Sequence, residues 1–187
     1  MTATPIFMFH KPRGCLVTRS DELGRRTVFD LLPDWVLAEG WKPVGRLDLD
    51  SRGLLLFVRD GKLQERLARP GTHDKTYEVW VRGRVSDDQL NQLKRGAQTA
   101  EGEMRAKSVE ARGGTGPKSR LLVTLDEGKN RQVRRMFGAL KDATTSKPLK
   151  VLELKRLSFG PIKLDIPSSH WRWLTPEEVA ALAGAAP

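Results

Sequence analysis

The stretch that decides the fold reads Gly45-Arg46-Leu47-Asp48-Leu49-Asp50-Ser51-Arg52-Gly53 and runs directly into Leu54-Leu55-Leu56-Phe57-Val58. The second part is an uninterrupted apolar run of strand length, which is typical of a β-strand buried on both faces. The first part is loop-like, with Asp48 and Asp50 close to two arginines. The sequence therefore predicts a charged loop that leads into a fully buried strand.

Asp48 allows more than one interpretation. Together with Asp50 it suggests the carboxylate pair of a glycosidase, but side chains at i and i+2 diverge on an extended chain, and that site needs two carboxyls converging on one bond. Alone, between Arg46 and an apolar strand, Asp48 suits a nucleophile or a base. A turn aspartate in a surface ion pair is the commoner alternative. The loop by itself leaves its chemistry open.

The segments around this stretch predict an α+β fold. Strands are indicated by apolar, branched or aromatic runs at 54–58, 75–81, 103–112, 119–126 and 149–159. Helices are indicated at 62–68, at 131–140, and after two capping boxes that begin at Ser86 and Thr175. Because strands outnumber helices and do not alternate strictly with them, we expect a mixed, mostly antiparallel central sheet flanked by helices. We expect a single domain over 1–187, with two sub-lobes of about 1–60 with 130–187 and 61–129.

The composition favours a polyanionic partner. The chain has 33 Lys and Arg against 23 Asp and Glu, a net charge of +10 in 187 residues, although a generally basic, solvated surface is the alternative. No apolar run approaches the roughly 18 residues of a transmembrane helix, and residues 1–9 lack the pattern of a signal peptide, so we expect a cytoplasmic protein without a membrane role. One cysteine and three scattered histidines form no disulfide framework and no zinc signature.

Two further segments carry residue types that suit RNA. Tyr77 is the only tyrosine and follows Lys75 by two residues in a predicted strand. Its ring either packs in the core or stacks on a base and assists proton transfer. Residues 127–135 read EGKNRQVRR, a turn followed by a helix start beside Lys129 and Arg131. Such a helix start binds phosphate readily, with a solvated basic face as the alternative.

Five motifs in this order resemble those of the pseudouridine synthases, and specifically the branch typified by the ribosomal small-subunit synthase A. They are KPRG at 11–14, GRLD at 45–48 with GLLL at 53–56, KTY at 75–77, EGKNRQVRRM at 127–136, and the closing segment 152–161 followed by Leu174-Thr175. GRLD alone is moderately specific, whereas the five motifs together are highly specific and cover nearly the whole chain. Two departures stand out. The KPRG motif begins too early for the S4-type RNA-binding module that many members carry in front of it, and the loop around 144–149 is longer than usual.

The resemblance implies the pseudouridine synthase fold and a cofactor-free isomerase. Such an enzyme detaches uracil from its ribose, turns the base and rejoins it through carbon 5 in a specific uridine of ribosomal RNA. By this resemblance Asp48 is the catalytic aspartate, Arg134 is the basic partner that favours its charged form, and Tyr77 stacks on the uracil. Leu154 forms an apolar wall of the pocket, and Arg46 helps to hold the flipped nucleotide open.

RNA contacts are expected from the basic residues of the motifs. They are Lys11, Arg13, Lys75, Lys129 and Arg131. Phosphate contacts from Lys11, Arg13, Lys129 and Arg131 would offset the few kcal/mol that unstacking the target base costs. The expected partner is large-subunit 23S rRNA or an assembly intermediate, bound by a monomer. The alternatives are a non-catalytic rRNA-binding or ribosome-assembly protein on the same fold and, less well supported, a glycoside hydrolase.

Overall fold

The computed structural model describes residues 5–184 and divides them into two compact units. Within the described residues, unit 1 comprises 5–73 with 156–184 and unit 2 comprises 74–155. These bounds differ from those of the sub-lobes expected from the sequence. Segment 61–73 belongs to unit 1 because its helix buries Leu67 in that unit's core. Segment 130–155 belongs to unit 2 because its helix is hydrogen-bonded within that unit, for example from Gln132 to the carbonyl of Arg105.

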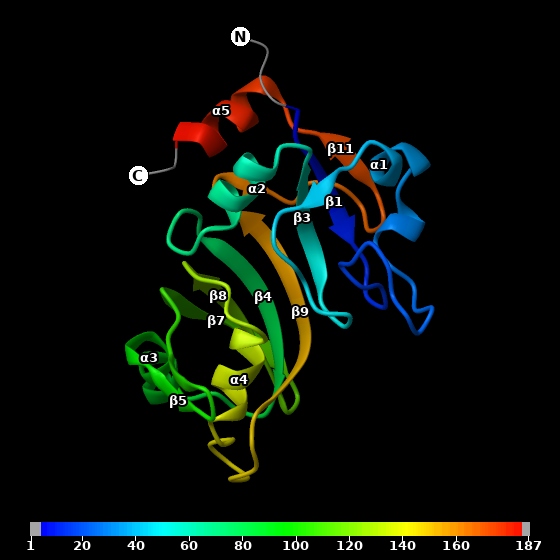
Figure 1. The fold of residues 1–187 in the computed structure, drawn as a ribbon. Coiled ribbons are helices and arrows are strands. Elements are labelled where there is room, and N and C mark those ends of the chain that lie inside the picture. Colours follow the sequence, from blue (N-terminus) through cyan, green and yellow to red (C-terminus); the bar gives the residue numbers. More distant parts are fainter. Residues whose placement is uncertain (1–4, 185–187) are drawn as a thin grey trace. The chain divides into compact units, whose positions relative to one another are not determined.

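Unit 1 contains a mostly antiparallel sheet, drawn in blue, cyan and orange in Figure 1. Its strands are β1 (Phe7–Lys11), β2 (Lys42–Pro43), β3 (Arg52–Val58), β10 (Ile162–Lys163), β11 (Trp171–Trp173) and the end of β9 (Lys150–Phe159). The strand order is β11-β1-β3-β9, with β2 also paired to β3 and β10 to β9. β1 runs antiparallel to β3, in the register that places Phe9 opposite Leu55. This part of the fold confirms the antiparallel arrangement predicted from the sequence.

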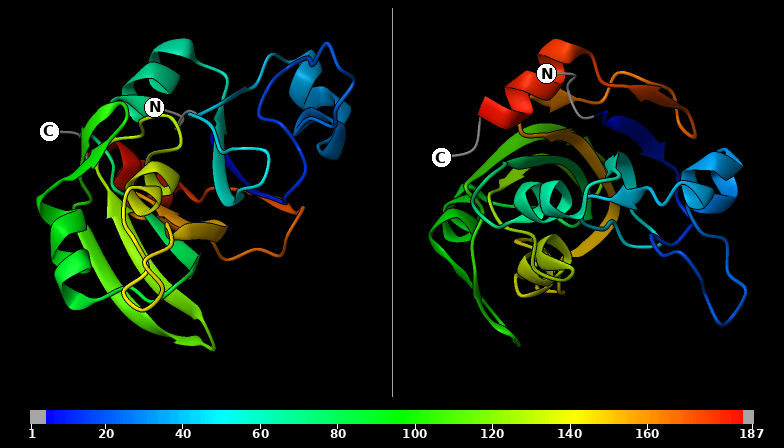
Figure 2. Two further views of the ribbon diagram at one scale, coloured as in Figure 1. Left: turned by 90° about the horizontal axis from the view of Figure 1, so that it is seen from below. Right: turned by 45° about the horizontal axis from the view of Figure 1, so that its top comes forward.

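Strand β3 is buried on both faces, as the apolar run predicts. Leu54, Leu56 and Val58 belong to one hydrophobic cluster, and Leu55 and Phe57 belong to another. The first cluster also includes side chains of α2 (Gly61–Ala68) and α5 (Pro176–Gly184), and the second those of η1 (Phe29–Leu31) and α1 (Asp34–Ala38). Figures 1 and 2 show α5 and α1 on either side of β1. Two helical layers therefore exclude water from both faces of β3.

Unit 2 contains the remaining strands and two helices. The elements are β4 (Lys75–Arg82), α3 (Asp87–Arg95), β5 (Ala97–Thr99), β6 (Gly102–Met104), β7 (Ser108–Thr115), β8 (Lys118–Leu125), α4 (Gln132–Gly138) and the first part of β9. The strand order is β9-β4-β8-β7, while β5 and β6 form a separate antiparallel pair. β4 and β8 are antiparallel from Lys75 opposite Leu125 to Arg82 opposite Lys118. Both units together confirm the α+β class.

One predicted strand of unit 2 was wrong in its bounds. Residues 103–112 do not form a single strand, because the chain leaves β6 after Met104 and enters β7 only at Ser108. Between them the amide of Ala106 donates to the carbonyl of Leu93 on α3. The apolar residues of 104–106 therefore pack against a helix before the chain joins the large sheet. The Ser86 capping box that starts α3 is confirmed, with Ser86 and Gln89 exchanging hydrogen bonds.

Candidate active-site residues in each unit

In unit 1 the GRLD segment ends in a tight turn that a lysine holds in place. The amide of Ser51 donates to the carbonyl of Asp48 at 3.0 Å, which closes the turn. The Nζ of Lys11 donates to the carbonyls of Asp48 at 3.0 Å, Ser51 at 2.8 Å and Pro12 at 3.1 Å. The amide of Gly14 also donates to the carbonyl of Leu49. The KPRG and GRLD motifs are thus bound to each other through backbone carbonyls.

This arrangement corrects the predicted role of Lys11. Its side chain is fully buried, and its three donors are directed at protein carbonyls, so it does not face an RNA phosphate. Burial lowers its pKa from the ordinary lysine value, and the nearby acidic groups, Cys15, Asp50 and Asp48, oppose that shift only in part. A buried ammonium is tolerated because its hydrogen bonds are satisfied. Lys11 is a positioning residue for the Asp48 turn, whereas Arg13 is exposed.

The side chains of the turn alternate between protein and solvent. Arg46 is exposed, Leu47 is buried, and Asp48 is half-buried. Leu47 is thus anchored in unit 1, while both of its neighbours are accessible to solvent. Asp48 therefore lies at the surface of a rigid turn, where a carboxylate can meet a substrate.

Gly53, at the start of β3, explains the glycine of the motif. Its φ is +118°, and a Cβ atom built there would lie 2.3 Å from the carbonyl oxygen of Arg156. The backbone of β9 therefore approaches β3 too closely for any side chain at this position. Arg156 is 2% exposed, and its Nε donates to the carbonyl of Leu54 at 2.7 Å. Sequence reasoning missed this arginine, although a charged residue inside the predicted strand 149–159 was a signal.

In unit 2 the KTY motif opens β4. The buried positions of this strand alternate, and they are Lys75, Tyr77, Val79 and Val81. Tyr77 is 7% exposed and lies opposite Val123 of β8. Lys75 is 6% exposed, about as much as Tyr77. The motif thus places a lysine and an aromatic ring on one buried face.

Helix α4 carries the basic residues of the EGKNRQVRRM motif. It forms within the predicted helical segment 131–140, and Val133, Met136 and Phe137 are buried. Arg134 is half-buried, and its Nη1 donates to the carbonyl of Val151 on β9 at 3.1 Å. Leu154 lies three residues further along β9 and is 7% exposed.

The start of α4 is not an open phosphate site. The helix has only seven residues and begins after Arg131, whose backbone is left-handed with φ of 51°. The buried amide of Gln132 accepts from the amide of Lys129 and donates to Glu127 and to the carbonyl of Arg105. Lys129 also forms a salt bridge with Glu127 at 3.2 Å. Lys129 and Arg131 are nevertheless exposed.

The structure thus groups the predicted residues by unit. Unit 1 brings together Lys11, Arg46 and Asp48 around one turn. Unit 2 carries Tyr77 on β4 and Leu154 on the adjacent strand β9, to which Arg134 is hydrogen-bonded. Within residues 5–184, no helix is long and apolar enough to cross a lipid bilayer.

Comparison with known proteins identifies the class. Residues 5–139 match the model of the RNA pseudouridylate synthase family. The chain therefore belongs to the RNA pseudouridylate synthase family, as its motifs predict.

The relatives narrow the resemblance to one group. The chain is 40% identical over 177 residues to ribosomal large subunit pseudouridine synthase B of Haemophilus influenzae, covering 93% of this chain and 47% of that protein. It is 40% identical over 169 residues to the synthase B of Escherichia coli K12, covering 89% and 55%. The chain thus spans about half the length of the curated relatives it matches. The motifs suggest ribosomal large subunit pseudouridine synthase E as the most similar member, whereas these relatives are named synthase B.

Solved structures support the fold. A crystal structure of a pseudouridylate synthase aligns with a TM-score of 0.79 at 28% identity, covering 95% of this chain and 73% of that one. An H/ACA ribonucleoprotein bound to a substrate RNA containing 2′-deoxyuridine aligns with a TM-score of 0.62 at 17% identity, covering 87% and 50%. The second likeness concerns the fold alone.

Proposed function

We propose that this protein isomerises a specific uridine of large-subunit 23S ribosomal RNA to pseudouridine. The observation that carries this proposal is the Asp48 turn, in which the buried Lys11 holds the backbone of the GRLD aspartate. Membership of the family and the 40% identical relatives named large-subunit synthases support it. A rigid turn that leaves the carboxylate half-exposed suits a residue that must meet a flipped base.

The chemistry is an intramolecular transfer. The bond between N1 of uracil and C1′ of ribose breaks, a bond between C5 and C1′ forms, and the C5 proton is lost while N1 gains a proton. Asp48 is the proposed nucleophile, attacking the base or the sugar. We propose that Tyr77 stacks on the uracil and assists removal of the C5 proton. We propose that Arg134 is the basic residue that accompanies the catalytic aspartate. The bonds exchanged balance without an external oxidant, reductant or group donor.

Binding must offset the cost of extracting the base. Unstacking and unpairing a nucleotide costs a few kcal/mol. We assign phosphate contacts to Arg13, Lys129 and Arg131, which are exposed, and we assign Arg46 to the flipped nucleotide. Leu154 remains the proposed apolar wall. Lys75, on the same buried face of β4 as Tyr77, remains a proposed contact to the substrate RNA. Lys11 is left out because its ammonium donates to three protein carbonyls.

The alternative is a non-catalytic rRNA-binding or ribosome-assembly protein. It is disfavoured by an aspartate held at the surface of a positively charged protein, since a carboxylate repels RNA phosphates. Such a protein would not need the hydrogen bonds by which Lys11 holds the backbone of Asp48 and Ser51.

Tritium release from RNA labelled at C5 of uridine distinguishes the two. With large-subunit rRNA as substrate, wild type should release tritium and Asp48→Asn should not, although it still binds the RNA. Asp50→Asn is the matched control, because it removes one carboxylate from the same turn and should keep turnover. No release by wild type on any rRNA or assembly intermediate would favour the binding protein. Release by Asp48→Asn would mean that another residue is catalytic.

We also propose that the enzyme acts as a monomer in the cytoplasm, where its ribosomal substrate is made. Sedimentation equilibrium of the purified protein tests the first point, and fractionation of cells tests the second. A stable dimer, or recovery in the membrane fraction, would contradict these assignments.

A further inference from the structure

A cleft of about 590 Å³ opens in unit 1 beside the GRLD segment. Its walls come from the loop at 17–19, from β2 with Gly45 and Arg46, and from the second half of α2. None of these residues except Arg46 is used in the function proposed above.

The rim of the cleft is positively charged. Arg19, Lys42 and Arg46 line it, against a single acidic residue, Glu65. Within residues 5–184, none of the three cations forms a salt bridge. Arg19 is oriented by donating to the carbonyl of Leu37 at 3.3 Å. Cations without acidic partners along one cleft make its electrostatic potential positive, and this potential attracts anions.

The floor of the cleft is apolar, with one polar group. Phe29, Pro43 and Ala68 contribute carbon surface. Gln64 also lines the cleft, and its Nε2 donates to the carbonyl of Pro43 at 2.8 Å, which orients the amide and leaves its oxygen as an acceptor. An apolar floor, a hydrogen-bond acceptor and a cationic rim complement the three parts of a nucleotide: the face of the base, its polar edge and its phosphate.

The cleft is close to the Asp48 turn along the chain. Arg46 lines the cleft and precedes Asp48 by two residues. Since successive Cα atoms are 3.8 Å apart, the Cα atoms of Arg46 and Asp48 lie at most about 7.6 Å apart. An RNA strand whose target base reaches Asp48 therefore brings its next nucleotides to this cleft.

We propose that the cleft binds a nucleotide that flanks the target uridine in single-stranded RNA. Its base lies on the apolar floor, and its phosphate contacts Arg19 and Lys42. This inference rests on the proposed function, because it takes the RNA at Asp48 as the starting point. It adds a nucleotide-binding site to the contacts assigned above.

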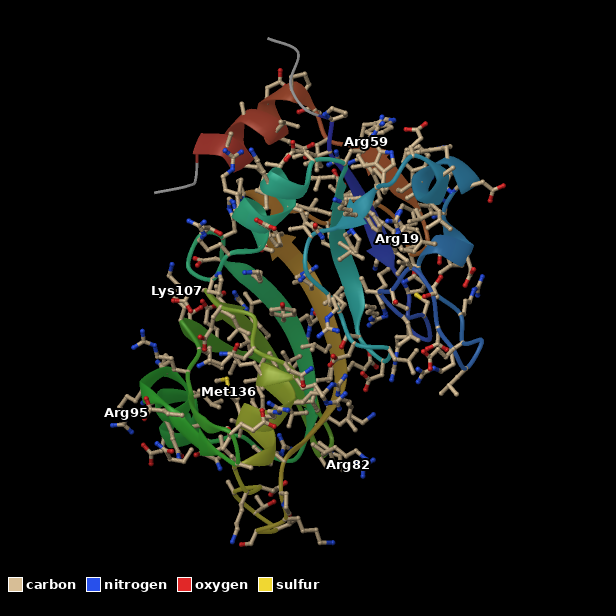
Figure 3. The ribbon with its side chains drawn as sticks, viewed as in Figure 1. Arg19, Arg59, Arg82, Arg95, Lys107 and Met136 are labelled. Carbon is tan, nitrogen blue, oxygen red and sulfur yellow. The ribbon has the colours of Figure 1, made fainter. Side chains whose placement is uncertain are left out.

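Binding of a fluorescent ten-nucleotide oligouridylate, followed by anisotropy, tests the cationic rim. Arg19→Ala combined with Lys42→Ala should weaken binding by about tenfold or more, since two phosphate contacts are lost. The slope of log K against log salt should become shallower by about 0.7 for each lost contact. Arg59→Ala is the matched control: Arg59 lies elsewhere on unit 1 (Figure 3), is exposed, and should leave affinity and slope close to those of wild type.

A second variant tests the floor without changing charge. Ala68 is exposed at the last position of α2, so Ala68→Trp adds a ring that fills the cleft while the helix remains intact. It should weaken oligouridylate binding and leave the salt slope unchanged. The thermal melting of each variant, compared with wild type, shows that the fold is retained.

The outcomes separate this inference from the proposed function. In the tritium assay, the Arg19 and Lys42 double variant should raise KM and keep kcat at saturating RNA. If the cleft variants bind oligouridylate as Arg59→Ala does, the cleft inference is overturned even though wild type releases tritium. If duplex RNA binding falls as much as oligouridylate binding, the cleft contacts a helix backbone, and the inference is again overturned. If wild type releases no tritium while the cleft variants lose binding, the proposed function alone fails.

Discussion

The structure gives Lys11 a different role from the one that its motif predicts. In the sequence it is one of 33 basic residues, and its motif suggests a phosphate contact. In the structure its ammonium is buried and bonded to three backbone carbonyls. Its neighbour Arg13 remains exposed. Two cations of one motif thus differ: Lys11 binds protein carbonyls, and Arg13 is exposed to solvent.

Replacing Lys11 with methionine should disturb the Asp48 turn. The change keeps the length of the side chain but leaves buried carbonyls without donors, so the free energy of unfolding should fall by about 3 kcal/mol. Turnover in the tritium assay should fall, while RNA affinity at a temperature where the variant is folded should not. Arg13→Ala is the control, with lower RNA affinity and an unchanged melting temperature. A Lys11→Met variant that melts like wild type but binds RNA poorly would contradict this account and support a phosphate contact by Lys11.

Gly53 gives a second prediction at this scale. Gly53→Ala places a methyl group against the carbonyl of Arg156 in a backbone conformation that favours glycine. Overpacking and strain together should lower the free energy of unfolding by about 3 kcal/mol or more, measured by urea denaturation. Gly14→Ala is the control, since Gly14 has a φ of +81° but nothing within 4 Å of the added atom. Equal losses in both variants would show that conformation, not the approach of β9, requires the glycine.

At the scale of elements, the helix starts follow their local signals. The Ser86 box is closed by hydrogen bonds in both directions between Ser86 and Gln89. The Thr175 box at α5 is closed in the same way, between Thr175 and Glu178. Such signals depend on residues three positions apart, and therefore the sequence reports them directly.

Ser86→Ala should destabilise unit 2 modestly. Loss of the cap leaves the amide of Gln89 without its acceptor, at a cost of about 1 kcal/mol. Urea denaturation measures the change. Ser86→Asp should restore most of the loss, because aspartate is an equally good cap, and failure of this rescue would argue against a capping role.

The loop after α4 depends on Asp142. Its carboxylate accepts from the hydroxyl and amide of Thr144, the amide of Thr145 and the amide of Arg84. These bonds, led by that of the Thr144 hydroxyl, hold the pKa of Asp142 well below its ordinary value. The sequence predicts only a polar loop here, because a carboxylate that organises a loop looks like any other charged residue.

The low pKa of Asp142 predicts a pH dependence of stability. In the unfolded chain Asp142 takes up a proton near the ordinary value of 3.8, and in the folded protein only at lower pH. Its stabilising effect is therefore complete above that value and is lost as pH falls below it. Asp142→Asn should melt below wild type at about pH 7, and the difference should shrink as the pH falls below about 4. A difference in melting temperature between Asp142→Asn and wild type that stays constant down to about pH 2 would contradict this account.

At the scale of the whole molecule, charge is distributed unevenly. Unit 2 carries 18 Lys and Arg against 11 Asp and Glu, a net charge of +7, whereas unit 1 carries 15 against 12, a net charge of +3. Several cations of unit 2 are already paired on its surface, such as Lys107 with Asp74 and Arg120 with Glu78. Exposed pairs of this kind contribute little stability.

RNA binding should therefore depend strongly on salt. With the five proposed phosphate contacts, of Arg13, Arg19, Lys42, Lys129 and Arg131, affinity for large-subunit rRNA should fall by about 10²-fold between 50 and 200 mM salt. Filter binding at a series of salt concentrations measures the slope. Asp48→Asn is the control and should keep the slope of wild type, since it touches no phosphate in this proposal. Binding that is insensitive to salt would remove the role proposed for the basic surface.

The sequence by itself determined the features that depend on near neighbours. The α+β class, the doubly buried strand β3, the capping boxes and the apolar stripe of α4 all follow from side-chain periodicity and local hydrogen bonding, which act over a few residues. The family also follows from the order of five motifs.

Only the tertiary structure decided what depends on residues far apart in the chain. The burial of Lys11 requires carbonyls that lie 37 and 40 residues further along the chain. The need for Gly53 comes from Arg156, and the cleft is built from three separate segments of unit 1. Whether a cation meets solvent or protein is set by packing, because the desolvation of its charge depends on everything around it. No pattern within either motif carries that information.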